Sequence, residues 1–393
     1  MINVSSLGHK IKIKLSQLKH LHRDSMFPAM AGTFLSLSLL LASTISVTKA
    51  QTNPINGSAS ALLVFGDSTV DAGNNNYLFT TFKGNFPPYG RDFKDHQPTG
   101  RFTNGRLGSD FVASYLGLKD DVPAYLDPTL SLEDLLTGVS FASAGTGFDT
   151  LTAQINDVIP VSTQLDYFRE YIDRIGAAIG RQEAEEHIRR AIVLISIGTN
   201  DFIVNYLALP FRKQTFTVGQ YQDFLLMKQG EFLQELRNLA VRRVAVVGLT
   251  PFGCIPLVIT LNSNGSGENI IDDRRCVESY NALSRDYNRK LQRALSVEHQ
   301  LFAQLGGGLV FMDVYQASYD IFNNPAKFGF EESRRGCCGT GLVEGAFLCN
   351  PTTPACLDAS KFVFFDSIHG TEKVYFLTFI YSLRGPIDRL LRG

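Results

Sequence analysis

The chain has 393 residues, of which 44% are hydrophobic and 19% carry a charge, so it can bury a large core. Its formal net charge of −1 hides an asymmetry, because residues 1–50 hold five lysines, one arginine and one aspartate and thus carry +5, which leaves −6 for the rest. A mildly acidic body gives no support for nucleic-acid binding, and we expect no such partner.

The N-terminal residues have the layout of a secretory signal. Basic residues precede a charge-free apolar segment at residues 33–47, TFLSLSLLLASTISV, and small residues follow at Thr48 and Ala50. This segment is shorter than the ~20 residues that a membrane span needs, although an uncleaved signal anchor is the alternative. We therefore expect residues 1–50 to be a signal peptide cleaved near Ala50. The remaining residues, 51–393, should form a single secreted domain without stable membrane insertion.

Beyond the signal, short β-rich apolar runs alternate with longer helical patterns. Leu165, Phe168 and Ile172 recur at helical spacing, and a polar helical pattern extends over residues 277–302. The apolar runs predict strands at residues 61–65, 139–142, 191–195, 243–247 and 309–314. Such alternation predicts an α/β fold with a parallel sheet covered by helices on both faces, and an active site outside the carboxyl ends of the strands.

The stretch VFGDSTVDAGNNN contains the end of the first predicted strand. Its apolar part stops abruptly at Gly66, Asp67 and Ser68, and a polar loop follows. Ser68 is either the polar residue that starts a helix or a nucleophile presented at the end of a strand. Asp67 and Asp71 match no calcium-loop spacing, so we interpret them as hydrogen-bonding loop residues and predict neither a metal nor a cofactor.

A serine nucleophile needs a base and a group that orients that base. Of the histidines beyond residue 50, only His369 has an aspartate at a useful distance, in the sequence FDSIH at residues 365–369. Such a turn can place the Asp366 carboxylate on the imidazole Nδ1 and stabilise the imidazolium that forms when Ser68 attacks. His187 and His299 lie in charged helical patterns and are expected to be solvated.

An oxyanion needs hydrogen-bond donors, and two further strand ends can supply them. Asn200, in the sequence GTND, follows the predicted strand 191–195 and can point its amide at the crevice that Ser68 faces; a helix N-cap is the alternative. Gly145 and Gly147, in SFASAGTGFD, form a third turn after a strand. There a backbone N–H can face the same crevice, or the glycines simply permit a tight turn.

The cysteines and two sequons agree with secretion. An even number of cysteines without a Cys-x-x-Cys pair favours disulfides over zinc, with 15 possible pairings. The adjacent Cys337 and Cys338 should have different partners. The six cysteines are Cys254, Cys276, Cys337, Cys338, Cys349 and Cys356. Asn56 and Asn264 begin Asn-Gly-Ser glycosylation sequons.

A series of sequence blocks runs in order over residues 60–380: VFGDSTVDAGNNN, FPPYGRDF, PTGRFTNGR, GVSFASAGTGFD, ISIGTNDF, VVGLTPFGCIPL, RRGCCGTG and FVFFDSIHGTEK. They contain GDS at 66–68, Gly147, GTND at 198–201 and DSIH at 366–369. These blocks resemble the plant secreted GDSL esterase/lipases of the SGNH hydrolase superfamily. No G-x-S-x-G occurs, so the nucleophile elbow of the α/β-hydrolase fold is not supported.

The resemblance implies a flavodoxin-like three-layer α/β/α sandwich around a five-stranded parallel sheet. It implies that Ser68 is the nucleophile, that His369 is the general base and later the acid, and that Asp366 orients the imidazole. The implied oxyanion donors are the backbone N–H groups of Ser68 and Gly147, preferred here over Gly145, and the side chain of Asn200.

Some positions depart from the group or belong to its loops. Gly370 stands where proline is usual after the histidine, and this could loosen the histidine turn and lower the rate. Arg91, Arg101 and Arg106 resemble fixed positions of the group, and we expect them to brace the loop over the site, with substrate contact as the alternative.

The sequence therefore predicts a secreted carboxylic ester hydrolase, located in the apoplast or cell wall, that works through an acyl-enzyme on Ser68. One alternative is an acyltransferase with the same triad, and another is a catalytically silent wall-binding protein on this scaffold. Acyl lipids, polyesters and acetylated polysaccharides are the candidate substrates, and the sequence leaves the choice among them open.

Overall fold

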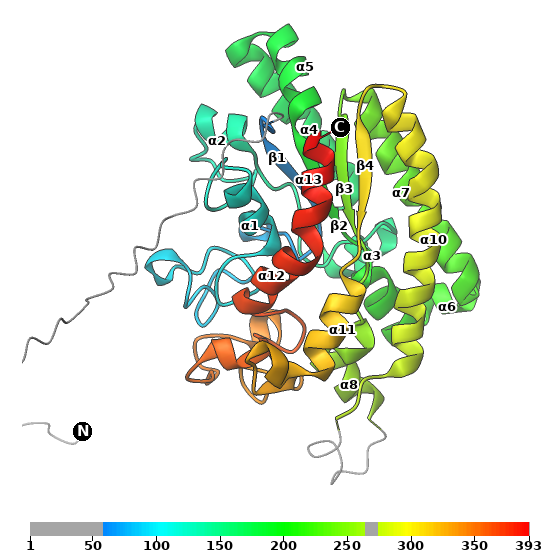
Figure 1. The fold of residues 1–393 in the computed structure, drawn as a ribbon. Helices are drawn as coiled ribbons and strands as arrows, with labels where there is room; N and C mark the ends of the chain where they lie inside the picture. Colours follow the sequence, from blue (N-terminus) through cyan, green and yellow to red (C-terminus); the bar gives the residue numbers. More distant parts are fainter. Residues whose placement is uncertain (1–57, 264–273, 393) are drawn as a thin grey trace, which may run out of the picture. The chain divides into compact units, whose positions relative to one another are not determined.

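A parallel β-sheet occupies the centre of the fold in the computed structural model, which describes residues 58–263 and 274–392 (Figure 1). Within those residues the sheet has four strands in the order β1-β2-β3-β4. They are β1 (Leu62–Gly66), β2 (Ile192–Ser196), β3 (Arg243–Val247) and β4 (Gly308–Met312). Four predicted strands are therefore confirmed, with bounds that differ by at most two residues.

Helices cover both faces of this sheet, as the alternation predicts. Side chains of β1 alternate between the faces, so that Leu62 and Val64 join one hydrophobic cluster while Leu63 and Phe65 join the other. One face is covered by α1 (Gly108–Tyr115), η8 (Phe379–Leu383) and α13 (Arg384–Arg392), and the other by α4 (Val161–Ile179), α7 (Val218–Asn238) and α10 (Glu278–Ala303). The result is a three-layer α/β/α sandwich.

The predicted strand at residues 139–142 is only partly formed. The segment runs parallel to β1, and Val64 donates a backbone hydrogen bond to one of its residues and accepts one from another. At the next position Ser143 N still donates to Gly66 O at 2.9 Å, but Gly66 N donates to Gln164 Oε1 on α4 at 3.0 Å and not to the segment, and Gln164 Nε2 donates back to Gly66 O. The expected fifth strand is thus a bridged edge segment. Counted with it, the order of the sheet is the flavodoxin-like 2-1-3-4-5.

A small two-stranded parallel sheet, β5 (Glu332–Gly336) and β6 (Phe362–Phe364), precedes the histidine turn. The loop between its strands carries the disulfides Cys337–Cys356 and Cys338–Cys349, and a third disulfide joins Cys254 to Cys276. All six cysteines are paired, and the prediction that Cys337 and Cys338 have different partners is confirmed.

Shorter helices complete the described part of the chain. They are η1 (Asn74–Tyr77), η2 (Lys94–His96), α2 (Leu132–Thr137), α3 (Thr150–Asn156), α5 (Arg181–Arg190), η3 (Asp201–Ala208), α6 (Phe211–Thr215), η4 (Phe252–Cys254), α8 (Pro256–Asn262), α11 (Tyr315–Asn323), η5 (Pro325–Phe328), η6 (Ala346–Leu348), η7 (Ala359–Lys361) and α12 (Glu372–Thr378). The predicted signal peptide, Asn56 and Asn264 lie outside the described residues.

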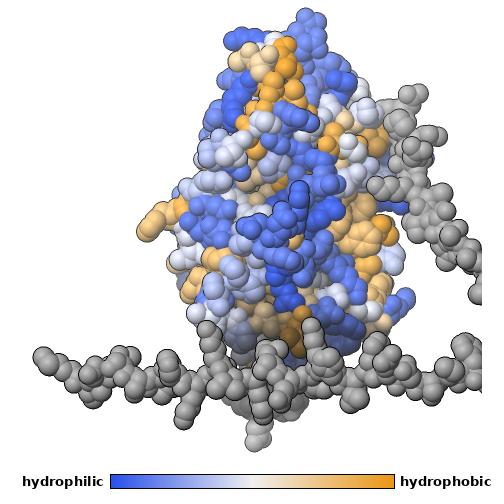
Figure 2. All heavy atoms as spheres, turned by 90° about the vertical axis from the view of Figure 1, so that its left-hand side faces the viewer, coloured by the Kyte–Doolittle hydropathy of each residue, from blue (hydrophilic) through white to orange (hydrophobic). Residues whose placement is uncertain are grey.

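The surface is mixed in polarity. Figure 2 shows one face, on which hydrophobic side chains gather in separate patches between hydrophilic ones. Phe79 and Leu357 are almost fully exposed, at 99% and 100%. None of the helices in residues 58–263 and 274–392 combines the length and the hydrophobicity that crossing a bilayer requires.

Candidate active site

The turn after β1 presents Ser68 at the carboxyl end of the sheet. Gly66 adopts φ +146°, and a Cβ at this position would lie 2.0 Å from the Ser196 carbonyl oxygen, so only glycine allows the chain to turn here. The side chain of Asp67 accepts hydrogen bonds from the backbone N–H and the hydroxyl of Thr69 at 3.0 and 2.8 Å. Burial nevertheless raises the pKa of Asp67 to about 6. Ser68 itself is 8% exposed.

His369 connects Ser68 to Asp366. Its Nε2 lies 2.8 Å from Ser68 Oγ, and its Nδ1 lies 2.8 Å from Asp366 Oδ2. The other carboxylate oxygen, Oδ1, accepts the backbone N–H groups of Ile368 and His369 at 2.8 and 2.7 Å. Because an ionised carboxylate only accepts hydrogen bonds, Nδ1 carries the imidazole proton and Nε2 is free to accept the Ser68 hydroxyl proton. The structure therefore brings the three predicted triad residues together.

The predicted oxyanion donors lie at neighbouring strand ends. Gly147 follows the edge segment beside β1, and Asn200 follows β2. Asn200 Nδ2 donates to Thr146 O at 2.9 Å, which leaves its second amide hydrogen available. The backbone N–H groups of Ser68 and Gly147 have no hydrogen-bond acceptor in the part of the chain that the structure describes. The arrangement thus offers three donors at the end of the sheet that carries Ser68.

A buried carboxylate that the sequence analysis did not select ties these two donor loops together. Asp201 Oδ2 accepts the Phe148 N–H at 2.9 Å, while Oδ1 accepts the Asp149 N–H at 3.2 Å and the Thr152 hydroxyl at 2.6 Å. A Cβ on Gly147 would lie 2.1 Å from Asp201 Oδ1. Burial raises the pKa of Asp201 to about 7. The sequence GTND was the available signal, but a local pattern does not show what the final aspartate contacts.

Asp71 is a loop hydrogen-bonder, as predicted. Its Oδ1 accepts the backbone N–H groups of Gly73 and Asn74, both at 2.8 Å, and its Oδ2 accepts that of Ala144 at 2.9 Å. Burial raises the pKa of Asp71 to about 6 although these bonds favour the ionised form. Asp71 therefore joins the loop after Ser68 to the turn that follows the edge segment.

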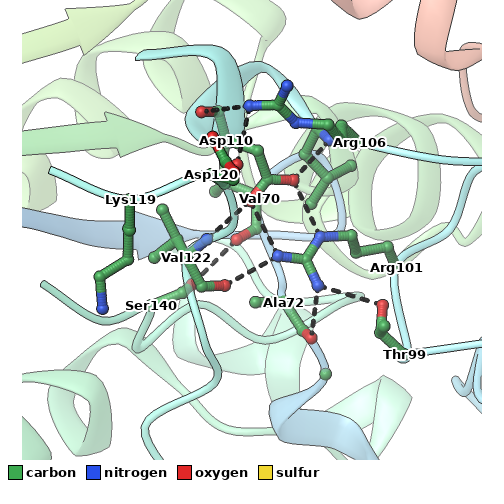
Figure 3. A network of polar contacts seen from close by, with 12 residues as sticks. Val70, Ala72, Thr99, Arg101, Arg106, Asp110, Lys119, Asp120, Val122 and Ser140 are labelled. Carbon is green, nitrogen blue, oxygen red and sulfur yellow. Dashed lines mark hydrogen bonds and ion pairs between the residues drawn. The ribbon is translucent and has the colours of Figure 1, made fainter. Parts of the chain in front are cut away.

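Arg101 braces the same loop, and Arg106 lies beside it on the other side of Asp110 (Figure 3). Arg101 is 4% exposed and forms a bidentate pair with Asp110 on α1, with N–O distances of 2.9 and 2.8 Å. It also donates to the carbonyl oxygens of Val122 and Ala72. Arg106 donates to the Asp110 carbonyl at 3.0 Å. The predicted bracing role is confirmed for Arg101, which reaches Ala72, whereas Arg106 holds α1 to the segment that follows it.

Loop residues also surround His369. The Phe102 ring packs against the imidazole with ring centroids 4.9 Å apart, and the Tyr89 hydroxyl reaches Asp366. Arg91 donates to the carbonyl of Leu357 at 2.7 Å and so braces the disulfide-bearing loop. The local sequence around Phe102 and Tyr89 does not mark them as site residues, because only the long-range folding of the chain brings them to His369 and Asp366.

One histidine differs from its predicted environment. His187, expected to be solvated, is 7% exposed. It lies on the same face of α5 as Ala184 and Ile188, which are 2% and 1% exposed, so helical spacing buries it with them. Burial lowers its pKa.

The amino-acid sequence is similar to those of known proteins, and these similarities indicate one family. Residues 62–379 match the model of the family described as GDSL-like lipase/acylhydrolase. A GDSL esterase/lipase of Arabidopsis thaliana is 50% identical over 334 residues, which cover 85% of this chain and 88% of that protein. A second from the same plant is 43% identical over 316 residues, which cover 80% and 86%.

Among solved structures, an acetylxylan esterase from Geobacillus stearothermophilus matches over 70% of this chain and 85% of its own, with 17% identity and a TM-score of 0.30. This likeness is too low to carry a functional inference.

Proposed function

The chain belongs to the GDSL-like lipase/acylhydrolase family and is a carboxylic ester hydrolase, and we propose that it works as a serine esterase with Ser68 as its nucleophile. The observation that carries the proposal is the continuous line of hydrogen bonds from Ser68 Oγ through His369 to Asp366, with 2.8 Å at each step. No other arrangement of the described histidines joins a serine hydroxyl to a carboxylate in this way.

Acylation begins when Ser68 Oγ attacks the ester carbonyl carbon and His369 Nε2 takes the hydroxyl proton. The carbonyl oxygen becomes negatively charged, and the imidazolium that forms is stabilised by Asp366. When the tetrahedral intermediate collapses, the bond to the leaving oxygen breaks and His369 returns its proton to that oxygen. The alcohol departs and the acyl group remains on Ser68.

Deacylation repeats these steps with water as the nucleophile. His369 takes a proton from the water as its oxygen attacks the acyl carbon, and later returns the proton to Ser68 Oγ. In both steps the N–H groups of Ser68 and Gly147 and the amide of Asn200 donate to the oxyanion. Loss of one such donor typically lowers kcat by ~10²–10³.

We also propose that the enzyme is secreted, with residues 51–393 as the mature domain in the apoplast or cell wall. Three disulfides support this location, because such bonds persist in oxidising compartments. The basic and apolar N-terminal pattern supports it as well. Acyl lipids, polyesters and acetylated polysaccharides are the substrate classes to test, and glycosylation at Asn56 and Asn264 remains a prediction.

The test is hydrolysis of p-nitrophenyl esters from acetate to palmitate by the parent and by Ser68→Ala. We expect activity in the parent and its loss in the variant. Ser318→Ala is a matched control, because this serine on α11 is also buried and is not part of the hydrogen-bonded line from Ser68 to Asp366. Activity that survives Ser68→Ala would overturn the serine mechanism. An added alcohol that yields a new ester in preference to the free acid would identify a transferase instead.

A further inference from the structure

Tyr89 contacts the proposed catalytic carboxylate from a loop that is 277 residues away in sequence. Its side chain is 1% exposed, and its hydroxyl donates to Asp366 Oδ2 at 2.6 Å. The same hydroxyl accepts the backbone N–H of Ala346 at 2.9 Å. The ring packs against Phe102 and Phe365, with centroid distances of 5.6 Å in each case. These contacts hold the single hydroxyl proton on the line to the carboxylate.

The carboxylate oxygen that Tyr89 contacts is the one that orients His369. Asp366 Oδ2 therefore accepts two hydrogen bonds, from the Tyr89 hydroxyl at 2.6 Å and from His369 Nδ1 at 2.8 Å. A donor to an ionised carboxylate stabilises its charge, and the carboxylate then attracts a second proton less strongly. The strength of the Asp366–His369 interaction thus depends on Tyr89.

We propose, on the basis of the serine mechanism above, that Tyr89 is a positioning residue that fixes Asp366 and weakens its attraction for the His369 proton. In this role Tyr89 keeps the imidazole free to act as a base at lower pH than the Asp366–His369 pair alone would allow. The hydroxyl does not touch the substrate and takes part in no bond that forms or breaks.

Other titratable groups face the pair from two further segments. Asp67, in the turn after β1, interacts electrostatically with His369, and Tyr375 on α12 interacts with Asp366 and Asp67. Burial, followed by the Asp366 charge, raises the pKa of both Tyr89 and Tyr375 above the usual value, so both phenols keep their protons. Asp67, with its pKa raised to about 6, titrates in the working range. Because Asp67 is the same in the parent and in the Tyr89 variants, it does not obscure a difference between them.

The experiment compares the pH profiles of kcat/KM for the parent, Tyr89→Phe and Tyr115→Phe. Tyr115→Phe is the matched control, because that hydroxyl also donates to a carboxylate, Asp388 on α13, but away from the triad. We expect the acidic limb of Tyr89→Phe to move to higher pH by roughly half a unit or more. Its kcat should fall by roughly tenfold, part of the ~10²–10⁴ that positioned acid–base catalysis contributes, with KM unchanged. Tyr115→Phe should match the parent.

A second variant gives a shift of opposite sign. Replacing Tyr89 by 3-fluorotyrosine makes the phenol a stronger donor, and the acidic limb should then move to lower pH. An acidic limb that stays in place in both Tyr89 variants overturns the proposal, even if kcat falls. Ser68→Ala, assayed alongside, separates the two proposals: activity in that variant overturns the serine mechanism, whereas its inactivity with an unmoved Tyr89→Phe limb overturns only the role of Tyr89.

Discussion

In the strand-end half of the site, which holds Ser68, Gly147 and Asn200, buried aspartates accept hydrogen bonds from the backbone N–H groups of the loops that follow the strands. In the C-terminal half, which holds Asp366 and His369, the hydroxyl of a tyrosine and a loop closed by disulfides fix the position of the carboxylate. Asp201 shows the first mode, because it accepts the N–H groups of two residues directly after Gly147. Tyr89 shows the second, because its hydroxyl joins Asp366 to the Ala346 N–H.

The difference shows how a nucleophile and its base can be held to one geometry from separate parts of a chain. The residues of the strand-end half are positioned by a parallel sheet, because the carboxyl ends of its strands lie at the same edge. The C-terminal half has only the short strand β6 before its turn, and long-range contacts fix it. We therefore expect substitutions in the first half to lower activity by displacing the hydrogen-bond donors. Substitutions in the second half should lower activity by loosening the loop that holds Asp366 in place.

Apart from Ser68→Ala, the largest expected effect comes from Gly147→Ala in the strand-end half. The new Cβ would lie 2.1 Å from Asp201 Oδ1, a distance that no atom tolerates, so the loop or the carboxylate must move. Because the displaced backbone N–H is an oxyanion donor in the proposed mechanism, kcat should fall by ~10²–10³ while KM changes little. Steady-state kinetics on the best p-nitrophenyl ester measures this.

Gly308→Ala in β4 is the control for Gly147→Ala. A Cβ there meets Leu390 at 3.6 Å, an ordinary contact, and the position is remote from the triad. A Gly147→Ala enzyme that keeps more than about half of the parent kcat would contradict the assignment of Gly147 as a donor. Gly145, whose N–H was the alternative in the sequence analysis, would then be the residue to test.

The strand-end half was largely predictable from sequence, since buried parallel strands are short apolar runs and their ends are marked by abrupt polar turns. Ser68, Gly147 and Asn200 all stand at such ends. The predicted strand at residues 139–142 formed only in part, because the side chain of Gln164 on α4 accepts the backbone N–H of Gly66 that would otherwise have bonded to the segment. The pattern of apolar residues in a strand does not show that a distant side chain will accept one of its backbone hydrogen bonds.

The C-terminal half was predictable only in part. His369 and Asp366 could be found because few histidines were available and one had a nearby aspartate. The contact of Tyr89 with Asp366 could not be found, because its loop has no hydrophobic period and its partner is 277 residues away. The disulfide pairing was equally hidden, since cysteine spacing alone permits many pairings.

A smaller effect is expected from removing one disulfide from each part of the molecule. Cys338→Ser/Cys349→Ser frees the loop that holds Ala346, whereas Cys254→Ser/Cys276→Ser frees a loop outside it. The bridged residues are 11 and 22 positions apart, so each removal should lower the free energy of unfolding by a similar ~2–4 kcal/mol. Only the first should also lower kcat markedly, because Ala346 N–H holds the Tyr89 hydroxyl.

Urea unfolding and steady-state kinetics on the two double variants, at a temperature where both are folded, measure these effects. Equal losses of kcat would mean that the Cys338–Cys349 loop supports the triad no more than the rest of the scaffold does. The contrast between the two halves would then be wrong for the C-terminal one.

The smallest expected effect is a change in how stability depends on pH after Asp201→Asn. The folded state raises the pKa of Asp201 from 3.8 to about 7, so between these values the folded chain holds a proton that the unfolded chain has lost. This contribution to stability is complete below about pH 4 and is lost as the pH rises through 7. Asparagine does not titrate, and the difference in unfolding free energy between parent and variant should therefore shrink by roughly 1–3 kcal/mol from pH 4 to pH 7.

Urea unfolding at pH 4, 5.5 and 7 measures this difference. Asp71→Asn should show the same trend, completed about one pH unit lower, since the pKa of Asp71 is raised to about 6. Parallel stability curves for parent and Asp201→Asn would show that folding leaves the pKa of Asp201 near 3.8, so that the aspartate is a charged group across most of this range.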